Sequence, residues 1–149
     1  MPKKKIITLS ILIVFQISVI AAMFIKAGAI KNYAIKNDSI IRVHCTAYDP
    51  FHPLKGRYVQ LTLNSDDIKS AQAELGCNLS GIWKSANAYY LQEEYALIMD
   101  SMNWKDFNSL DPVLELYVGK NGSVIQKAMY VHHNAQELPI EQYIKDYKL

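Results

Sequence analysis

The sequence predicts an α+β protein, in which a single N-terminal transmembrane helix precedes a small domain with a mainly antiparallel β-sheet and a few short helices. Three observations predict this class. An uncharged, largely apolar run extends from Ile6 to Ile25, and a helix over it would be about 30 Å long, enough to cross a bilayer core. Short segments with alternating apolar residues follow, as in half-buried strands. The sequence Gly119-Lys120-Asn121-Gly122 separates two of these segments and indicates a hairpin.

The apolar run has two interpretations, a cleaved signal peptide and a signal-anchor that stays in the membrane. A signal peptide has an apolar region of about 7 to 15 residues and a cleavage site of the small-x-small type, which Ala27-Gly28-Ala29 resembles. The run is longer than that, and Lys26 separates it from the cleavage-like sequence. We therefore favour the anchor. The chain then divides into residues 1–35, which hold a cytoplasmic tip, the anchor helix and a juxtamembrane connector, and residues 36–149, the extracytoplasmic domain.

The first half of the domain predicts two strands and a helix. Ile40–Tyr48 alternates loosely between apolar and polar residues, as a strand does. Residues 49–56 contain two prolines and a glycine and are expected to form a rigid loop. The loop leads into a second strand, Arg57–Leu63, in which we expect Tyr58 to be buried. The Ser-Asp-Asp sequence at 65–67 provides an N-cap and an acidic first turn, which predicts either a short helix over Asp66–Leu75 or a helical turn in an otherwise irregular link.

The second half predicts two helices and three strands. The aromatic content of Ile82–Leu91 favours a strand, and helix-forming residues dominate Glu93–Met102. Val113–Val118 and Ser123–Val131 are the two strands of the hairpin. Pro139 suits the first position of a C-terminal helix.

Charge is divided unevenly between the two parts of the chain. Residues 1–39 carry six lysines and one aspartate, a net charge of +5, whereas residues 40–149 carry ten lysines and arginines against thirteen acidic residues, a net charge of −3. A mildly acidic domain without a basic cluster argues against nucleic acid as a partner. The lipid bilayer, contacted through Ile6–Ile25, is the first partner that we expect.

The two cysteines, Cys45 and Cys77, also have two interpretations. In an oxidising compartment they could pair, and the disulfide would stabilise the domain by about 3 kcal/mol. Alternatively, Cys45 is a small buried apolar residue in its strand. The four histidines lack the spacing of a metal site, and His132 and His133 would point to opposite faces of a strand. We expect no metal and no cofactor.

Two arrangements of side chains could support catalysis. Asp49, at a strand end, and Glu93, at a helix start, could act as acid and base in a hydrolase; the alternative is that each caps its own turn or helix. Ser39 could be the nucleophile of a vestigial membrane protease with a Ser/Lys dyad, but Lys69 and Lys84 are expected to be solvated rather than buried beside it. The sequence leaves an enzymatic activity uncertain and names no catalytic residue.

The segment Gly56-Arg57-Tyr58-Val59-Gln60-Leu61-Thr62-Leu63, with Asp49-Pro50 before it, resembles the GDYXXLXY family of bacterial envelope proteins. It matches the family's Gly, Tyr and inner Leu. It differs at the Asp, which is Arg57 here, and at the last Tyr, which is Leu63. The segments Tyr89–Glu93, 120–130 and 138–141 are also similar to parts of the family pattern, so the resemblance covers most of the chain after the anchor.

The resemblance implies a membrane-anchored extracytoplasmic domain, often encoded beside multi-spanning membrane proteins, with no established catalytic activity. We therefore expect an accessory or interaction domain of the bacterial cytoplasmic (inner) membrane, with its N-terminus in the cytoplasm, its domain on the outer face, and a multi-spanning membrane protein as partner. The residues expected to shape its binding surface are Asp49, Pro50, Gly56, Arg57, Tyr58, Leu61, Tyr90 and Glu93.

Overall fold

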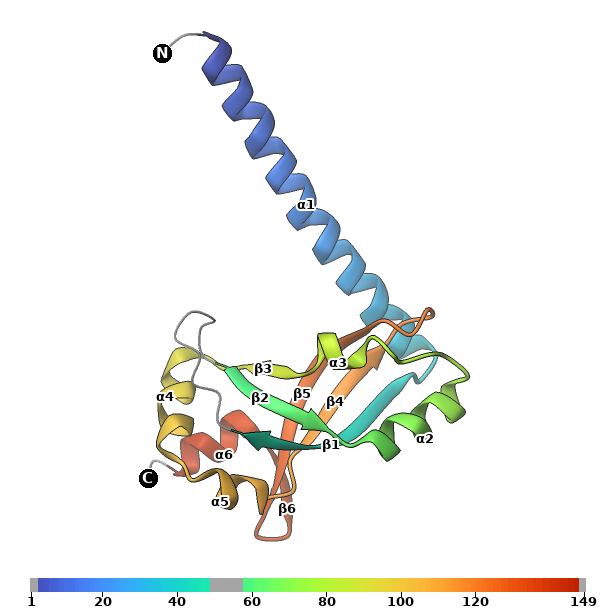
Figure 1. Ribbon diagram of the computed structural model, residues 1–149, viewed down its shortest axis with the longest axis vertical. Helices are drawn as coiled ribbons and strands as arrows, with labels where there is room; N and C mark the ends of the chain where they lie inside the picture. Colours follow the sequence, from blue (N-terminus) through green and yellow to red (C-terminus); the bar gives the residue numbers. More distant parts are fainter. Residues whose placement is uncertain (1–2, 49–57, 148–149) are drawn as a thin grey trace.

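The computed structural model describes residues 3–48 and 58–147. One long helix, α1 (Lys3–Lys36), projects from a domain built on a curled six-stranded antiparallel sheet (Figure 1). The strands lie in the order β3-β2-β1-β4-β5-β6. Their bounds are β1 (Ile40–Tyr48), β2 (Tyr58–Leu63), β3 (Ala88–Tyr90), β4 (Val113–Val118), β5 (Val124–His133) and β6 (Gln136–Pro139). The short helices are α2 (Ser65–Leu75), α3 (Ile82–Ser85), α4 (Glu93–Ser101), α5 (Trp104–Asn108) and α6 (Ile140–Tyr147). The predicted fold class is confirmed.

Strand β1 lies in the middle of the sheet and separates a core face from an outer face. Its alternate residues Ile41, Val43, Cys45 and Ala47 are all buried, at 6% exposure or less. They share the core face with apolar residues of β4 and β5, and helices α2, α3, α5 and α6 pack against these strands. The residues of β1 between them, such as Arg42, are exposed on the outer face. The expected alternation of this strand is therefore observed.

Helix α1 continues well past the apolar run and is docked on the domain. Its apolar side chains up to Ile25 are exposed all round, whereas Ile30 is 9% exposed and Ala34 is fully buried near β4. The helix ends at Lys36, and the N–H of Ser39 donates to the carbonyl of Ala34 at 2.9 Å as the chain turns into β1. The segment expected as a connector is thus the last part of one continuous helix.

Helix α2 and the β4–β5 hairpin form as the sequence predicts. Gly76 has φ 60 and ends α2, as its left-handed conformation requires at a helix C-terminus. The cap at the other end is Asn64, whose side chain accepts hydrogen bonds from the N–H groups of Asp66 and Asp67, so the expected cap at Ser65 is one residue too late.

Two expectations for the second half were wrong. Ile82–Leu91 is not one strand: α3 occupies its first four residues, with Ile82 buried, and only Ala88–Tyr90 pair with β2. Pro139 does not begin a helix but ends β6, which pairs with β5 across a turn at Asn134 and Ala135. Both turn residues have positive φ, 51° and 62°, as a tight hairpin turn demands, and alanine gives no sequence signal for that conformation.

Gly122, in the β4–β5 turn, lies against the backbone of Asn78 and provides a test of that contact. It has φ 75, and a Cβ atom there would overlap the backbone carbonyl of Asn78. Gly122→Ala should therefore lower the free energy of unfolding by roughly 2–4 kcal/mol, measured by urea titration of the full chain in detergent micelles. The matched control is Gly81→Ala, because a Cβ at Gly81 meets nothing within 4 Å; equal stability of the two variants would contradict the turn geometry.

Candidate functional site

The described part of the predicted binding surface lies where β2 pairs with the edge strand β3. Tyr58 is opposite Tyr90 in the register, and their rings are 5.7 Å apart between centroids. Val59 and Leu61 are buried in the core, so Tyr58 faces the other side of the sheet and is only half-buried. The expectation that Tyr58 is a core residue was therefore wrong; the strand alternation turns it away. Tyr90 is 67% exposed.

Of the predicted Asp49/Glu93 pair, only Glu93 is among the described residues. Asp49, with Pro50, Gly56 and Arg57, lies outside the described residues. Glu93 is exposed in the first turn of α4, where the helix dipole stabilises a negatively charged carboxylate. The N-cap of that helix is Gln92, which makes no side-chain capping bond.

Ser39 and the two lysines do not form a dyad. Ser39 is 6% exposed, and its hydroxyl donates to the carbonyl of Asn37 at 3.4 Å. The Lys69 ammonium lies 2.9 Å from Asp66 on exposed surface, and Lys84 is also exposed. The prediction that both lysines are solvated is confirmed.

Both cysteines are free thiols in this structure, Cys45 buried and Cys77 half-buried. The Cys45 Sγ–H donates to the carbonyl of Pro112 at 3.3 Å. Burial, and then the charge of Asp111, raise the pKa of Cys45 to about 12. Its thiol is therefore protonated at neutral pH and is a poor nucleophile.

A row of carboxylate and imidazole side chains crosses the outer face, from β1 past the loop at Asp111 (the 111 corner) to the β5–β6 hairpin. His44 Nδ1 lies 2.8 Å from Asp67 Oδ2, and His44 Nε2 lies 3.7 Å from Asp111 Oδ2. On the other side of Asp111, His132 Nδ1 lies 4.0 Å from the same oxygen, and His132 Nε2 lies 3.7 Å from Glu137 Oε1. The row therefore alternates carboxylate and imidazole from Asp67 to Glu137, and we call these five residues the outer-face network.

The outer-face network joins segments that are far apart in the sequence. Asp111 holds its carboxylate between the two imidazoles with a left-handed backbone, φ 49, a conformation that aspartate adopts more readily than most residues. Arg42 donates to Glu137 and lies 5.5 Å above the ring of Tyr130. A neighbouring pair, Lys127 Nζ and Glu115 Oε2 at 2.7 Å, extends the polar surface along β4 and β5.

The outer-face network holds separate segments of the domain together through polar and ionic contacts. Its three carboxylates, of Asp67, Asp111 and Glu137, outnumber the one guanidinium in the described part of the chain that contacts them, that of Arg42. Among the described residues, no serine, threonine or cysteine donates to His44 or His132, so the pairs lack a nucleophile. The same residues contain no group of three or more His, Cys, Asp and Glu arranged to hold a metal ion.

The sequence analysis did not predict this network, although one of its pairs could have been predicted from the sequence. The prediction that His132 and His133 point to opposite faces is confirmed, because His133 stacks edge-on against Tyr143 of α6 at 5.3 Å while His132 faces Asp111. Recognition of the β5–β6 hairpin would also have placed His132 beside Glu137, its partner in the register.

Asp67 gives the network a measurable pH dependence. Partial burial raises the pKa of Asp67, but hydrogen bonds from the N–H and imidazole of His44, and its charge, outweigh that effect and lower the pKa overall. The folded-state pKa is therefore below the unfolded value of about 3.8. The stability that Asp67 contributes is fully present above that value and is lost as the pH falls through the folded-state pKa.

Asp67→Asn should therefore cost up to about 1 kcal/mol at pH 7 and flatten the acid limb of the stability curve. Urea titrations of the full chain between pH 2.5 and about 7 would measure this. The matched control is Asp66→Asn, because Asp66 is adjacent but is exposed and pairs only with Lys69 among the described residues. An unchanged acid limb in Asp67→Asn would contradict the assigned role.

No family model, curated protein or solved structure matches the chain. The chain's function is therefore inferred from three features of its own geometry: the exposed apolar helix, its docking on β4, and the aromatic edge at β3.

Proposed function

We propose that this protein is a single-pass, membrane-anchored accessory domain on the outer face of a bacterial cytoplasmic membrane, where it binds a multi-spanning membrane protein. The observation that carries the proposal is the unbroken course of α1 from the exposed apolar run into buried contact with β4. The resemblance to the GDYXXLXY family is consistent with the same role, and that family assignment is part of the proposal.

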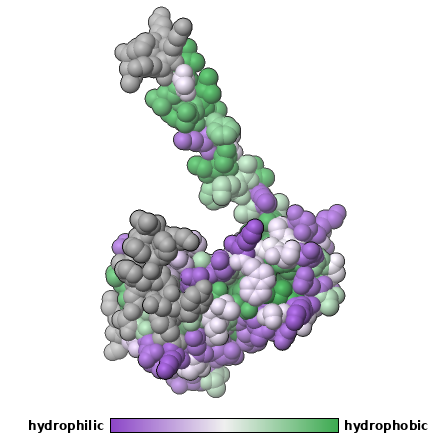
Figure 2. All heavy atoms as spheres, viewed as in Figure 1, coloured by the Kyte–Doolittle hydropathy of each residue, from purple (hydrophilic) through white to green (hydrophobic). Residues whose placement is uncertain are grey.

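The surface of α1 supports the anchor. The helix is long and apolar enough to cross a bilayer, and none of the apolar window is buried against the domain. Its apolar side chains are exposed, and Figure 2 shows them on the visible face of the helix above the domain. An isolated helix with this surface is stable in lipid, because lipid covers its side chains and its backbone groups bond internally.

The docking of α1 supports a fixed orientation of the domain. Ile30 and Ala34 are buried near β4, and Gly119 allows the turn to approach Ile30 closely, since a Cβ there would lie only 3.2 Å from Ile30 Cγ1. A domain on a flexible linker would sample many orientations. This one presents the same face to any neighbour in the membrane, which lowers the entropic cost of binding such a neighbour.

The edge strand β3 supports the position of the binding surface. Among the described residues β3 is paired on one side only, by β2. Exposed aromatic residues lie along it, Tyr90 on β3 itself and Trp83 on α3, which is 42% exposed. In Figure 1, β3 and α3 lie on the side of the domain from which α1 rises. Exposed tyrosine and tryptophan are typical of protein interfaces. The backbone edge itself is partly occupied, because the carbonyl of Ala88 accepts a hydrogen bond from Gln126 Nε2 of β5 at 2.8 Å, so the aromatic side chains provide the binding surface.

Site-specific crosslinking tests the proposal. A photoreactive amino acid in place of Tyr90 should give adducts with a membrane protein in intact membranes, whereas the same label in place of Lys69, which is 73% exposed on α2, should not. A flexible Gly-Ser insertion between Ile25 and Lys26 keeps the docked part of α1 and should reduce the Tyr90 adducts severalfold, because the orientation is lost. Equal labelling from both positions, or recovery of uncrosslinked monomer alone, would contradict the proposal.

A further inference from the structure

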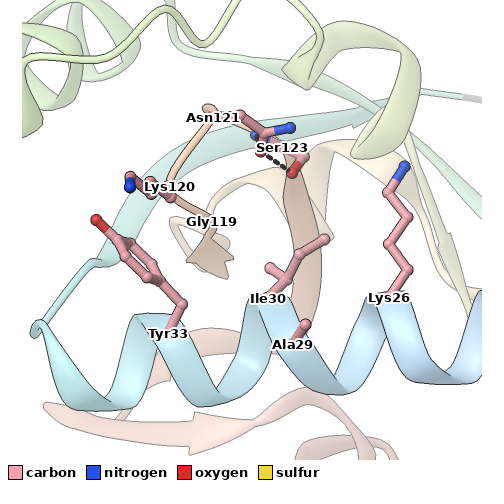
Figure 3. A pocket seen from close by; sticks show the side chains of 8 residues that line it. All are labelled: Lys26, Ala29, Ile30, Tyr33, Gly119, Lys120, Asn121 and Ser123. Carbon is pink, nitrogen blue, oxygen red and sulfur yellow. Dashed lines mark hydrogen bonds between the residues drawn. The ribbon is translucent and has the colours of Figure 1, made fainter.

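A cavity lies between the last turns of α1 and the β4–β5 turn. Its volume is about 300 Å³, at the small end of the range for ligand sites. Figure 3 shows Ile30 on its floor, Lys26 at one end, and Tyr33 with Lys120 at the other. The lining residues are Lys26, Ala29, Ile30, Tyr33, Gly119, Lys120, Asn121 and Ser123.

The lining combines positive charge with an apolar floor. Among the described residues no carboxylate lines the cavity, and neither Lys26 nor Lys120 forms an ion pair with any of them. Asn121 and Ser123 add side-chain donors and acceptors and bond to each other. The two ammonium groups therefore attract an anion, and Ile30 contributes apolar contact beneath it.

The cavity also lies at the level of lipid headgroups if α1 is the anchor. The apolar run from Ile6 to Ile25 is about 30 Å long as a helix, which equals the thickness of the hydrocarbon core. Lys26 is the next residue and so lies at the boundary of that core. The headgroup layer on each side is roughly 5–7 Å thick. A helix crosses that thickness in about three to five residues, so Ala29 and Ile30 lie near its outer boundary.

We propose that this cavity binds the headgroup of an acidic phospholipid in the outer leaflet. The inference rests on the proposed function, because it requires α1 to stay in the membrane. Lys26 would bind the phosphate, with its alkyl chain beside the glycerol backbone and the first acyl carbons, while Ile30, farther from the membrane core, would form the apolar floor beneath the headgroup. Lys120, at the outer end, discriminates between lipids: it repels the trimethylammonium group of phosphatidylcholine, whereas the hydroxyl groups of phosphatidylglycerol can accept its hydrogen bonds.

Native mass spectrometry of the full chain in detergent, titrated with phosphatidylglycerol or phosphatidylcholine, tests the proposal. We expect one phosphatidylglycerol bound at least fivefold more tightly than phosphatidylcholine. Lys120→Gln should weaken phosphatidylglycerol binding about fivefold, the factor for one basic side chain at an anionic surface, and Lys26→Gln by a similar factor. Lys69→Gln, which removes an exposed lysine outside the cavity, should have no effect.

Three results would overturn the proposal: equal affinity for the two lipids, an unchanged affinity in Lys120→Gln, or displacement of the lipid by millimolar inorganic phosphate, which would indicate a site for free phosphate. A separate measurement tests the anchor. The intact mass of the protein from membranes should include residues before Lys26; loss of these residues would contradict the proposed function, whereas an intact anchor without lipid selectivity would overturn only this inference.

Discussion

The burial of the last turns of α1 against β4 is the contact on which the rest of the structure depends. Ala34 is fully buried, and Ile30 packs beside Gly119, where a side chain would not fit without displacement. Asp38 then reverses the chain with φ 52, and the carbonyl of Ser39 accepts from Val118 N–H at 2.9 Å. This bond places the start of β1 beside the end of β4, so α1 packs where the two middle strands of the sheet begin their pairing.

The central position of β1 separates two surfaces with different chemistry. One set of alternate residues fills the core, while Arg42 and His44 join the outer-face network, which ties α2, the 111 corner and the β5–β6 hairpin together. Tyr90 on β3 and Trp83 on α3 are exposed at the edge of the sheet opposite β6. In this account the core and the outer-face network stabilise the domain, α1 orients it, and the β3 edge binds the partner.

Local signals predicted the parts of this structure that local interactions determine. The β4–β5 hairpin follows from its Gly-containing turn, and α2 ends at Gly76 because glycine tolerates φ 60. The α3 turn was missed because the aromatic residues around Trp83 favoured a strand, although tertiary burial of Ile82 selects a helical turn. The outer-face network could not be predicted, since Asp67, Asp111 and His132 meet only after β1, β4 and β5 have paired. The docking of α1 is equally nonlocal, because Ala34 carries no signal that it will meet β4.

The distance distribution between α1 and the domain tests the central claim most directly. Pulsed electron paramagnetic resonance measures this distribution between nitroxide labels at Ala22→Cys and Lys69→Cys. The native cysteines are replaced by Cys45→Ala and Cys77→Ser, and the protein is reconstituted in lipid nanodiscs. Both labelled positions are exposed. A docked α1 predicts one narrow distribution that broadens in Ala34→Glu, because a carboxylate cannot be buried at that contact without a partner. A broad distribution in the parent protein, unchanged by Ala34→Glu, would contradict the account.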